Sequence, residues 1–325
     1  MLHGKQASGA FAPAVLPLGA SLGQSGNNYL PLPPLQNVSI SLPSGVQPVY
    51  QLGVFPLKDV VNLTIQPTDV SFTFPLTQDY PYYGQLLSLL TKDPTTNHYP
   101  LLDLRIYLGK TYLDGKHVTI DLCGCIVRRL NFNFREGVAT LSLSLGVATG
   151  VMYISADDNL LPPQFATFVP PARKVAAYCR ITHPQEGVPT DTLADFLQSP
   201  TKFAVVGASV DVNITTRYIH TMPTLYHAFF GGDSPIIPTG VPSTIQEGTE
   251  TYSGDIALIL PPSTPQPPIA SPIGVYNIYI ITDANLVVLL REAKIASVNP
   301  SIAAASPTTF TITFQGMGAH FFLLT

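Results

Sequence analysis

The side chains that usually carry chemistry are few and widely separated in this sequence. Of the seven histidines, only His220 and His227 lie close together, and Pro223 separates them, so we expect no joint metal site. Cys123 and Cys125 enclose a single residue, whereas zinc-binding cysteine pairs usually enclose two or more. In a strand both would face the same side, and we expect two small buried side chains.

No pattern for nucleophilic or phosphate chemistry stands out either. Cys179 and His183 could act as a nucleophile and its base, but no carboxylate has a defined spacing to orient them. Asp157 and Asp158 fall beside a proline-rich stretch, where turn formation accounts for them. The sequence has no glycine-rich phosphate loop and no His-Glu-x-x-His pair. We therefore predict that the protein is not an enzyme and has no catalytic, metal-binding or cofactor-binding residues.

Low charge is the most unusual property of the composition. The chain has 325 residues, of which only 11% are charged, against about 25% in an ordinary soluble protein. Hydrophobic residues make up 46%, yet no apolar run approaches the roughly 18 residues of a membrane helix, so we expect no membrane association. A net charge of −4 gives no basic field to hold nucleic acid. The surface must therefore be apolar, which predicts a protein partner.

Alternating polar and apolar residues predict a mainly β fold. Two short stretches look helical instead: Pro81–Leu90, with Asp79 placed to cap it, and Pro223–Phe230, which ends at two glycines. Asp191–Leu197 could add a third helix. The strands with the clearest alternation are Val70–Phe74, Leu104–Leu108, Ala139–Leu145, Val210–Ile214, Asp255–Leu260 and Phe310–Phe314.

The order of these elements occurs twice, which indicates an internal repeat. Val118–Leu130 and Leu286–Val298 are equally long, and an asparagine follows each stretch. Further on, Thr140–Leu145 matches Thr309–Phe314, and this second match implies one extra loop residue in the second copy. The alternative is that two unrelated β-meanders look alike, because side-chain identity between the copies is low.

The repeat and the density of proline divide the chain into parts. Each copy predicts a β-sandwich or barrel with one short flanking helix. The N-terminal part is so rich in proline and glycine that it predicts an extended arm. The expected parts are the arm at 1–50, a first domain at 51–155, a proline-rich joint and start of the second domain at 156–200, and the second domain proper at 201–325.

Two predicted strands have no lysine to protect their edges. Val70–Phe74 and Val210–Ile214 occupy the same place in the two copies, each ahead of a helix. Exposed edge strands usually carry lysine, which discourages pairing with other chains. These strands are expected either to pair with other subunits or to be buried inside a sandwich.

This order of elements resembles the tail tube proteins of long-tailed bacteriophages (siphoviruses). The resemblance covers residues 51–325 and rests on Val70–Phe74, the helix that starts at Pro81, Val118–Leu130 and Ala139–Leu145, repeated in the second half. The tandem copy, the many prolines and the few lysines are similar to the tube proteins of very-long-tailed Thermus phages, and high proline content suits a thermophilic source. The family implies a virion structural protein whose domains form six-membered rings stacked into a tube for DNA delivery. Two domains per chain then imply self-assembly into a trimeric, pseudo-sixfold ring that polymerises head to tail.

The resemblance also implies partners and contacts. The partners would be further copies of the chain and other phage tail proteins (tape measure, tail terminator and distal tail proteins). DNA would pass through without specific binding, and the protein would reside in the viral tail after assembly in the host bacterial cytoplasm. The candidate lumen or inter-subunit residues are Val70, Phe72, Phe74, Val118, Ile120, Asp121, Val210, Asp211, Val212, Ile214, Leu286 and Val288. The candidate ring-to-ring contacts are Arg128, Arg129, Arg291, Tyr112, Asp114, Tyr29 and Leu30.

Two other classes of protein stay open. Another virion part, such as a distal tail adaptor or a capsid protein of sandwich type, would differ from a tube protein in not forming a helical polymer when purified. A soluble binding module or an enzyme would be a stable monomer with a deep polar pocket.

Overall fold

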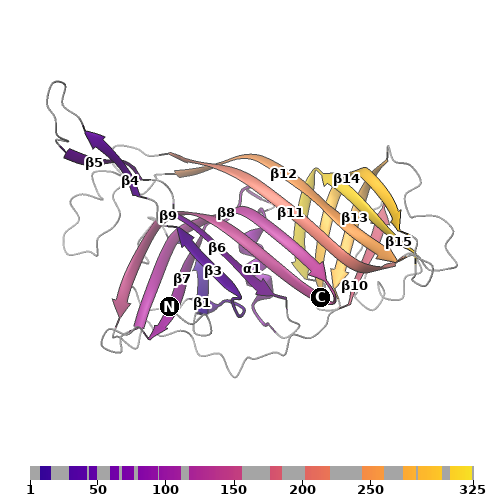
Figure 1. Cartoon of the computed structure of the whole chain (residues 1–325), viewed down its shortest axis with the longest axis horizontal. Coiled ribbons are helices and arrows are strands. Elements are labelled where there is room, and N and C mark those ends of the chain that lie inside the picture. The colour runs from indigo at the N-terminus through magenta and orange to yellow at the C-terminus, as the bar shows by residue number, and fades with distance from the viewer. Residues whose placement is uncertain are drawn as a thin grey trace.

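In the computed structural model the described part of the protein is built almost entirely of strands, with one short helix (Figure 1). The predicted mainly β class is therefore confirmed. The structure describes residues 8–15, 29–41, 44–49, 59–65, 68–76, 80–93, 95–110, 117–155, 176–184, 202–219, 244–259, 274–282, 285–301 and 308–323.

Most strands belong to one 14-stranded sheet, and two more form a separate ribbon. The elements of the first half are β1 (Ser8–Pro13), β2 (Leu30–Pro31), β3 (Asn37–Ser41), β4 (Ser44–Val49), β5 (Asp59–Ile65), β6 (Thr68–Pro75), α1 (Tyr83–Leu90), β7 (Leu102–Lys110), β8 (His117–Arg135) and β9 (Val138–Ser155). Those of the second half are β10 (Ala177–Thr182), β11 (Phe203–Ile219), β12 (Thr244–Ile259), β13 (Val275–Thr282), β14 (Leu286–Ser301), β15 (Thr309–Gly316) and β16 (Gly318–Leu323).

The second half forms a closed six-stranded barrel, seen at the right of Figure 1. Its strands follow the order β10-β13-β14-β15-β12-β11, and β11 pairs back to β10 at Cys179↔Phe203. Closure of the circuit satisfies the backbone groups that an open sheet would leave at two edges. The strand β16 continues along β14 beyond the end of β15.

The first half follows the same circuit, in the order β1-β7-β8-β9-β6-β3. Its closing strand is split in two, because β2 pairs with β1 and β3 pairs with β6. Pro33 and Pro34 lie between the two pieces. Since proline has no N–H to donate to a ladder, the closing strand is interrupted here, whereas the corresponding β11 runs on without a break.

The pairing registers agree between the halves. Leu130 in β8 lies opposite Leu143 in β9, and their counterparts in the repeat, Val298 in β14 and Ile312 in β15, lie opposite each other too. Both strand pairs contain a β-bulge at the corresponding position. This is the correspondence expected from the sequence, including the extra loop residue of the second copy. Two unrelated meanders would have no reason to share register and bulge position.

A second irregularity is also repeated. Gly124 in β8 and Glu292 in β14 both adopt a positive φ, 66° and 50°. The Gly124 N–H donates to Oδ1 of Asp103 on β7 at 2.9 Å, and the Glu292 N–H donates to Oδ1 of Asn277 on β13 at 3.1 Å. Each half therefore bends the corresponding strand, β8 or β14, at the same point and satisfies the displaced N–H with a buried side chain of the neighbouring strand.

The pairing corrects one equivalence expected from the sequence. Val70–Phe74 and Val210–Ile214 do not occupy the same place in the two halves, because β6 pairs with β9 whereas β11 pairs with β12 and β10. The counterpart of β6 is β12, and the counterpart of β11 is the split strand β2 and β3. Alternation identifies a strand but not its neighbours, which is why the sequence misassigned the pair.

Residues 1–50 are consequently more than an arm. Within this range β1, β2 and β3 belong to the sheet of the first half, and β1 lies between β2 and β7. Of the prolines in this range, Pro13 ends β1, and Pro33 and Pro34 lie in the split between β2 and β3, where a missing donor is tolerated.

A continuous core of apolar side chains runs through both halves. The helix α1 buries Tyr83, Leu86, Leu87, Leu89 and Leu90 in this core, as the apolar pattern of the Pro81 stretch predicts. It also contacts β16 of the second half. The helix begins without a side-chain cap, and the expected cap Asp79 lies outside the described residues. The helices expected at Pro223–Phe230 and Asp191–Leu197 lie outside them as well.

Candidate functional site

The two halves meet along one strand pairing, between β8 and β11. From here on we call this pairing the joint, and it is not the proline-rich stretch at 156–200. The C-terminal part of β8 lies antiparallel to β11, from Arg129↔Asn213 to Arg135↔Gly207. On their other sides β8 pairs with β9 and β11 pairs with β12, so the joint makes both halves part of one sheet (Figure 1).

One face of the joint is packed into the core. Leu130, Phe132, Ala208, Val210 and Val212 alternate with polar residues along the two strands and expose no more than 3% of their surface. Alternation brings them to one face of the sheet. Their burial makes the joint a part of the folded core, so the two halves cannot separate without exposing apolar surface.

The other face of the joint is polar. Arg129 donates to Oδ1 of Asp211 from Nε at 3.0 Å and from Nη2 at 2.7 Å. The Nδ2 of Asn131 donates to Oγ of Ser209 at 3.5 Å. The Arg129 side chain is 56% exposed, and water screens such a pair, so its contribution is on the order of 0.2–1 kcal/mol. The polar contacts on this face therefore set the register between the two strands more than they stabilise the fold.

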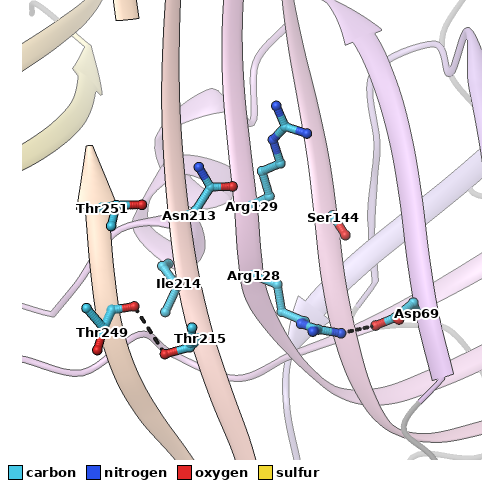
Figure 2. A pocket seen from close by; sticks show the side chains of 9 residues that line it. All are labelled: Asp69, Arg128, Arg129, Ser144, Asn213, Ile214, Thr215, Thr249 and Thr251. Atoms are coloured by element: carbon cyan, nitrogen blue, oxygen red, sulfur yellow. Dashed lines mark hydrogen bonds and ion pairs between the residues drawn. The ribbon is translucent and has the colours of Figure 1, made fainter. Parts of the chain in front are cut away.

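A shallow groove crosses the polar face beside the joint (Figure 2). Arg128 points along it and donates to Oδ1 of Asp69 at 2.6 Å. Gly146 on the neighbouring strand leaves room for Tyr218, since a methyl group there would clash with the tyrosine hydroxyl oxygen. Burial raises the pKa of Tyr218 to about 12. The groove is lined by Asp69, Arg128, Arg129, Ser144, Asn213, Ile214, Thr215, Thr249 and Thr251.

A two-stranded ribbon of the second half extends over the first half. This distal ribbon consists of residues 214–219 of β11 and 244–250 of β12. Oε1 of Glu247 accepts a hydrogen bond from the Tyr99 N–H at 2.5 Å, and Glu250 forms an ion pair with Lys92. Burial and the Glu250 carboxylate raise the pKa of Tyr99. The ribbon therefore binds the loop that follows α1 through hydrogen bonds and charge.

A buried ion pair distinguishes the first half from the second. Arg105 on β7 donates from Nε and Nη2 to the two carboxylate oxygens of Asp121 on β8, at 2.6 and 2.8 Å, and both side chains are fully buried. The guanidinium carbon also lies 4.7 Å from the ring centre of Tyr29. Burial alone would lower the pKa of Arg105, but the hydrogen bonds and charge of Asp121 raise it overall. In the second half Tyr279 and Leu289 occupy this register position.

Most candidate lumen residues are core residues, which corrects their assignment. The alternation that selected them marks the apolar face of each strand, and that face points into the protein. Val118 lies in β8 with a side chain outside the described residues, and Asp211 is at the joint. The residues buried in the chain itself are Val70, Phe72, Phe74, Ile120, Asp121, Val210, Val212, Ile214, Leu286 and Val288.

The candidate ring-to-ring contacts fall in several places. Arg128 and Arg129 form ion pairs with Asp69 and Asp211, which belong to the same chain. Arg291 is exposed on β14. Tyr29, 9% exposed, packs beneath Arg105, and Leu30 is half-buried in β2. The other two candidates, Tyr112 and Asp114, lie outside the described residues.

Within the described part of the chain, the side chains that could bind a metal ion stay apart. Across the described stretches, no three histidine, cysteine or acidic residues gather where they could hold a metal ion. Cys123 and Cys125 are buried, as predicted, and burial raises the pKa of the Cys125 thiol. No helix in the described part of the chain has the length and apolar character needed to cross a membrane.

Neither a protein-family model nor a curated protein sequence matches this chain. The joint is therefore the feature from which a function has to be argued. Sequence reasoning named Arg129 and Asp211 separately but did not pair them, because it matched β11 with the wrong strand. The sequence did contain one feature that could have indicated the joint, the asparagine that follows each repeated stretch (Asn131 and Asn299), because Asn131 lies in the joint.

Proposed function

We propose that this protein is a virion structural protein, a phage tail tube subunit that polymerises into stacked rings. In this proposal each ring holds three chains with pseudo-sixfold symmetry, and the stacked rings form the conduit through which DNA is delivered. Each half supplies one unit of the ring, and the joint is the contact between two neighbouring units.

The observation that carries the proposal is the repetition of one strand circuit within a chain. The two halves share strand order, register and bulges, and they are joined edge to edge through the joint. Two similar units held side by side by one directional contact are the beginning of a ring, because the same contact can be repeated between chains. A single barrel with an enzymatic pocket would need neither the duplication nor the joint.

The composition supports the same proposal. With 11% charged residues, the chain has too few charges to cover its surface as an independent soluble protein does. Surfaces covered by other copies do not need charge. A net charge of −4 also suits a wall that lets DNA pass without holding it, since binding to phosphate requires lysine and arginine.

Electron microscopy of the purified full chain tests this function. We expect rings with six lobes that contain three chains each, as counted from the particle mass, and tubes that lengthen as the protein concentration rises. Rings of six chains would contradict the pseudo-sixfold arrangement. Particles that stay monomeric at high concentration would contradict the tube. Discrete rings that never stack would favour a tail adaptor.

A further inference from the structure

Two strand edges in the described structure correspond to the two edges of the joint. In the correspondence between the halves, residues 129–133 of β8 match 297–301 of β14, and residues 207–211 of β11 match 37–41 of β3. We call 297–301 the β14 edge and 37–41 the β3 edge. Among the described strands, β14 pairs with β15 over residues 297–301, β3 pairs with β6 alone, and β3 does not pair with β14.

We infer that the β14 edge of one chain pairs antiparallel with the β3 edge of a second copy, repeating the joint between chains. The register follows from that of the joint. Asn131↔Asp211 and Asn133↔Ser209 become Asn299↔Ser41 and Ser301↔Ser39. This inference deepens the proposed ring and rests on it, because it names the strands through which successive chains would be linked.

The side chains of the two edges fit this pairing. At the joint the amide of Asn131 donates to Ser209, and the corresponding residues Asn299 and Ser39 are again an asparagine and a serine, both exposed. The same hydrogen bond can therefore form between two chains. An unrelated strand would have no particular reason to place a serine hydroxyl diagonal to this amide donor.

The apolar face of the two edges is incompletely covered. Val38, Ile40 and Val298 pack against the core but are only partly buried. Their counterparts in the joint, Ala208, Val210 and Leu130, expose 3% or less. Pairing with a second chain would bury these three side chains, as their counterparts are buried in the joint. Burial of apolar surface would favour association.

Neither edge carries charge to discourage pairing, although the β14 edge contains Pro300. Residues 37–41 and 297–301 contain no lysine, arginine, aspartate or glutamate. Natural edge strands that must stay single carry charges, above all lysine. Pro300 removes one donor from the β14 edge, so the pairing relies on the remaining donors and on the side-chain match at Asn299 and Ser301. The two strands that the sequence singled out as unprotected lie in β6 and β11, which are paired within the chain, so burial accounts for them and pairing with other subunits does not.

Disulfide trapping in the full chain tests the register. Directly opposite residues of antiparallel strands have Cα atoms about 4.5–5.5 Å apart, within reach of a disulfide. The double variant Ser39→Cys/Ser301→Cys should give covalently linked chains on a non-reducing denaturing gel after mild oxidation. Asn133→Cys/Ser209→Cys, at the corresponding place in the joint, should form its disulfide within one chain and leave the mass unchanged.

A matched control has its second cysteine one strand further away. Ser71 is exposed on β6 and lies directly opposite Ser39. In Ser71→Cys/Ser301→Cys the two sulfurs would be about two strand spacings apart, roughly 10 Å, which a disulfide cannot bridge. Linked chains in the Ser39→Cys variant and not in this control would support the pairing. Equal linkage in both would overturn it.

The same samples separate this inference from the proposed function. Rings or tubes in the electron microscope without linkage of Ser39→Cys/Ser301→Cys would leave the tube standing and overturn the β3–β14 pairing. Linked chains that run as an open ladder and never form rings would support the pairing and contradict the ring. A covalent trimer as the largest product would support both, because three linked chains then close on themselves.

Discussion

The joint and the β3 and β14 edges consist of corresponding strands, but they differ in charge. At the joint Arg129 pairs with Asp211, whereas the corresponding positions on the β14 and β3 edges are Ser297 and Ser41. A pairing inside one chain forms as the protein folds and tolerates charged groups at its rim. An edge that has to find its partner in solution avoids removing charges from water if it carries none. The difference agrees with the proposal that the joint forms by folding and that the β3 and β14 edges pair by assembly.

The strongest test of this comparison places a lysine at corresponding positions of the joint and of the β3 edge. Val210→Lys would bury an uncompensated charge at the joint, and we expect a loss of about 3–5 kcal/mol in the free energy of unfolding. Ile40→Lys lies on the half-buried β3 edge, where the lysine can reach water, so we expect little change in unfolding. Urea titration gives the stability of both variants, and light scattering gives their assembly. The comparison would fail if Ile40→Lys assembled like the unaltered chain.

The next test exchanges the buried ion pair for the apolar pair of the second half. Asp121→Leu leaves the fully buried Arg105 without its carboxylate, so the free energy of unfolding should fall by about 3–5 kcal/mol. The double variant Arg105→Tyr/Asp121→Leu copies Tyr279 and Leu289 and should recover most of that loss. Thermal unfolding of the two variants measures the difference. A double variant as unstable as the single one would mean that the halves pack differently around this position.

A smaller effect is expected at the repeated bulge. Glu292 adopts the left-handed conformation that Gly124 adopts in the first half, and a side chain there costs about 1–2 kcal/mol. Glu292→Gly should therefore stabilise the protein by about 0.5–1 kcal/mol after the greater freedom of glycine in the unfolded chain is deducted. Gly124→Ala should destabilise it by about 1–2 kcal/mol. Chemical denaturation of both variants checks the opposite signs, and equal signs would contradict the equivalence of the two bulges.

The smallest effect concerns salt. Asp211→Ser gives the joint the serine that the β3 edge has, and we expect a loss of about 0.2–1 kcal/mol at low ionic strength that vanishes near 1 M salt. Assembly through the charge-free edges should depend little on salt. Unfolding and light scattering measured over the same salt series compare the two contacts. Assembly that weakens steeply with salt would show that charged groups elsewhere on the surface hold the chains together.

The sequence revealed the class of fold and the repeat, but not the neighbours of each strand. The correspondence between the two copies holds in the structure because Val118–Leu130 and Leu286–Val298 are long enough for their pattern to fix a register. β2 was missed because it has two residues and contains Pro31. β3 was missed although Asn37–Ser41 alternates, because it is short and lies in a stretch rich in proline and glycine.

The side chains of the joint could be predicted only in part. Arg129 and Asp211 are 82 positions apart, and nothing local indicates that β8 and β11 are neighbours. The buried pair Arg105 and Asp121 reads as ordinary alternation, since a charged residue in a strand usually faces water. In both cases the information lies in the pairing of distant strands, which periodicity does not contain.

Covalent linkage of the two halves also affects how each contact depends on protein concentration. The strands of the joint are tethered to each other, so each meets the other at an effective concentration in the millimolar range, whatever the dilution of the protein. A pairing between β3 and β14 has no tether and follows the actual concentration of chains. In the proposed ring, three of the six contacts would thus be complete before any two chains meet, and only the remaining three would be decided by how much protein the cell has made.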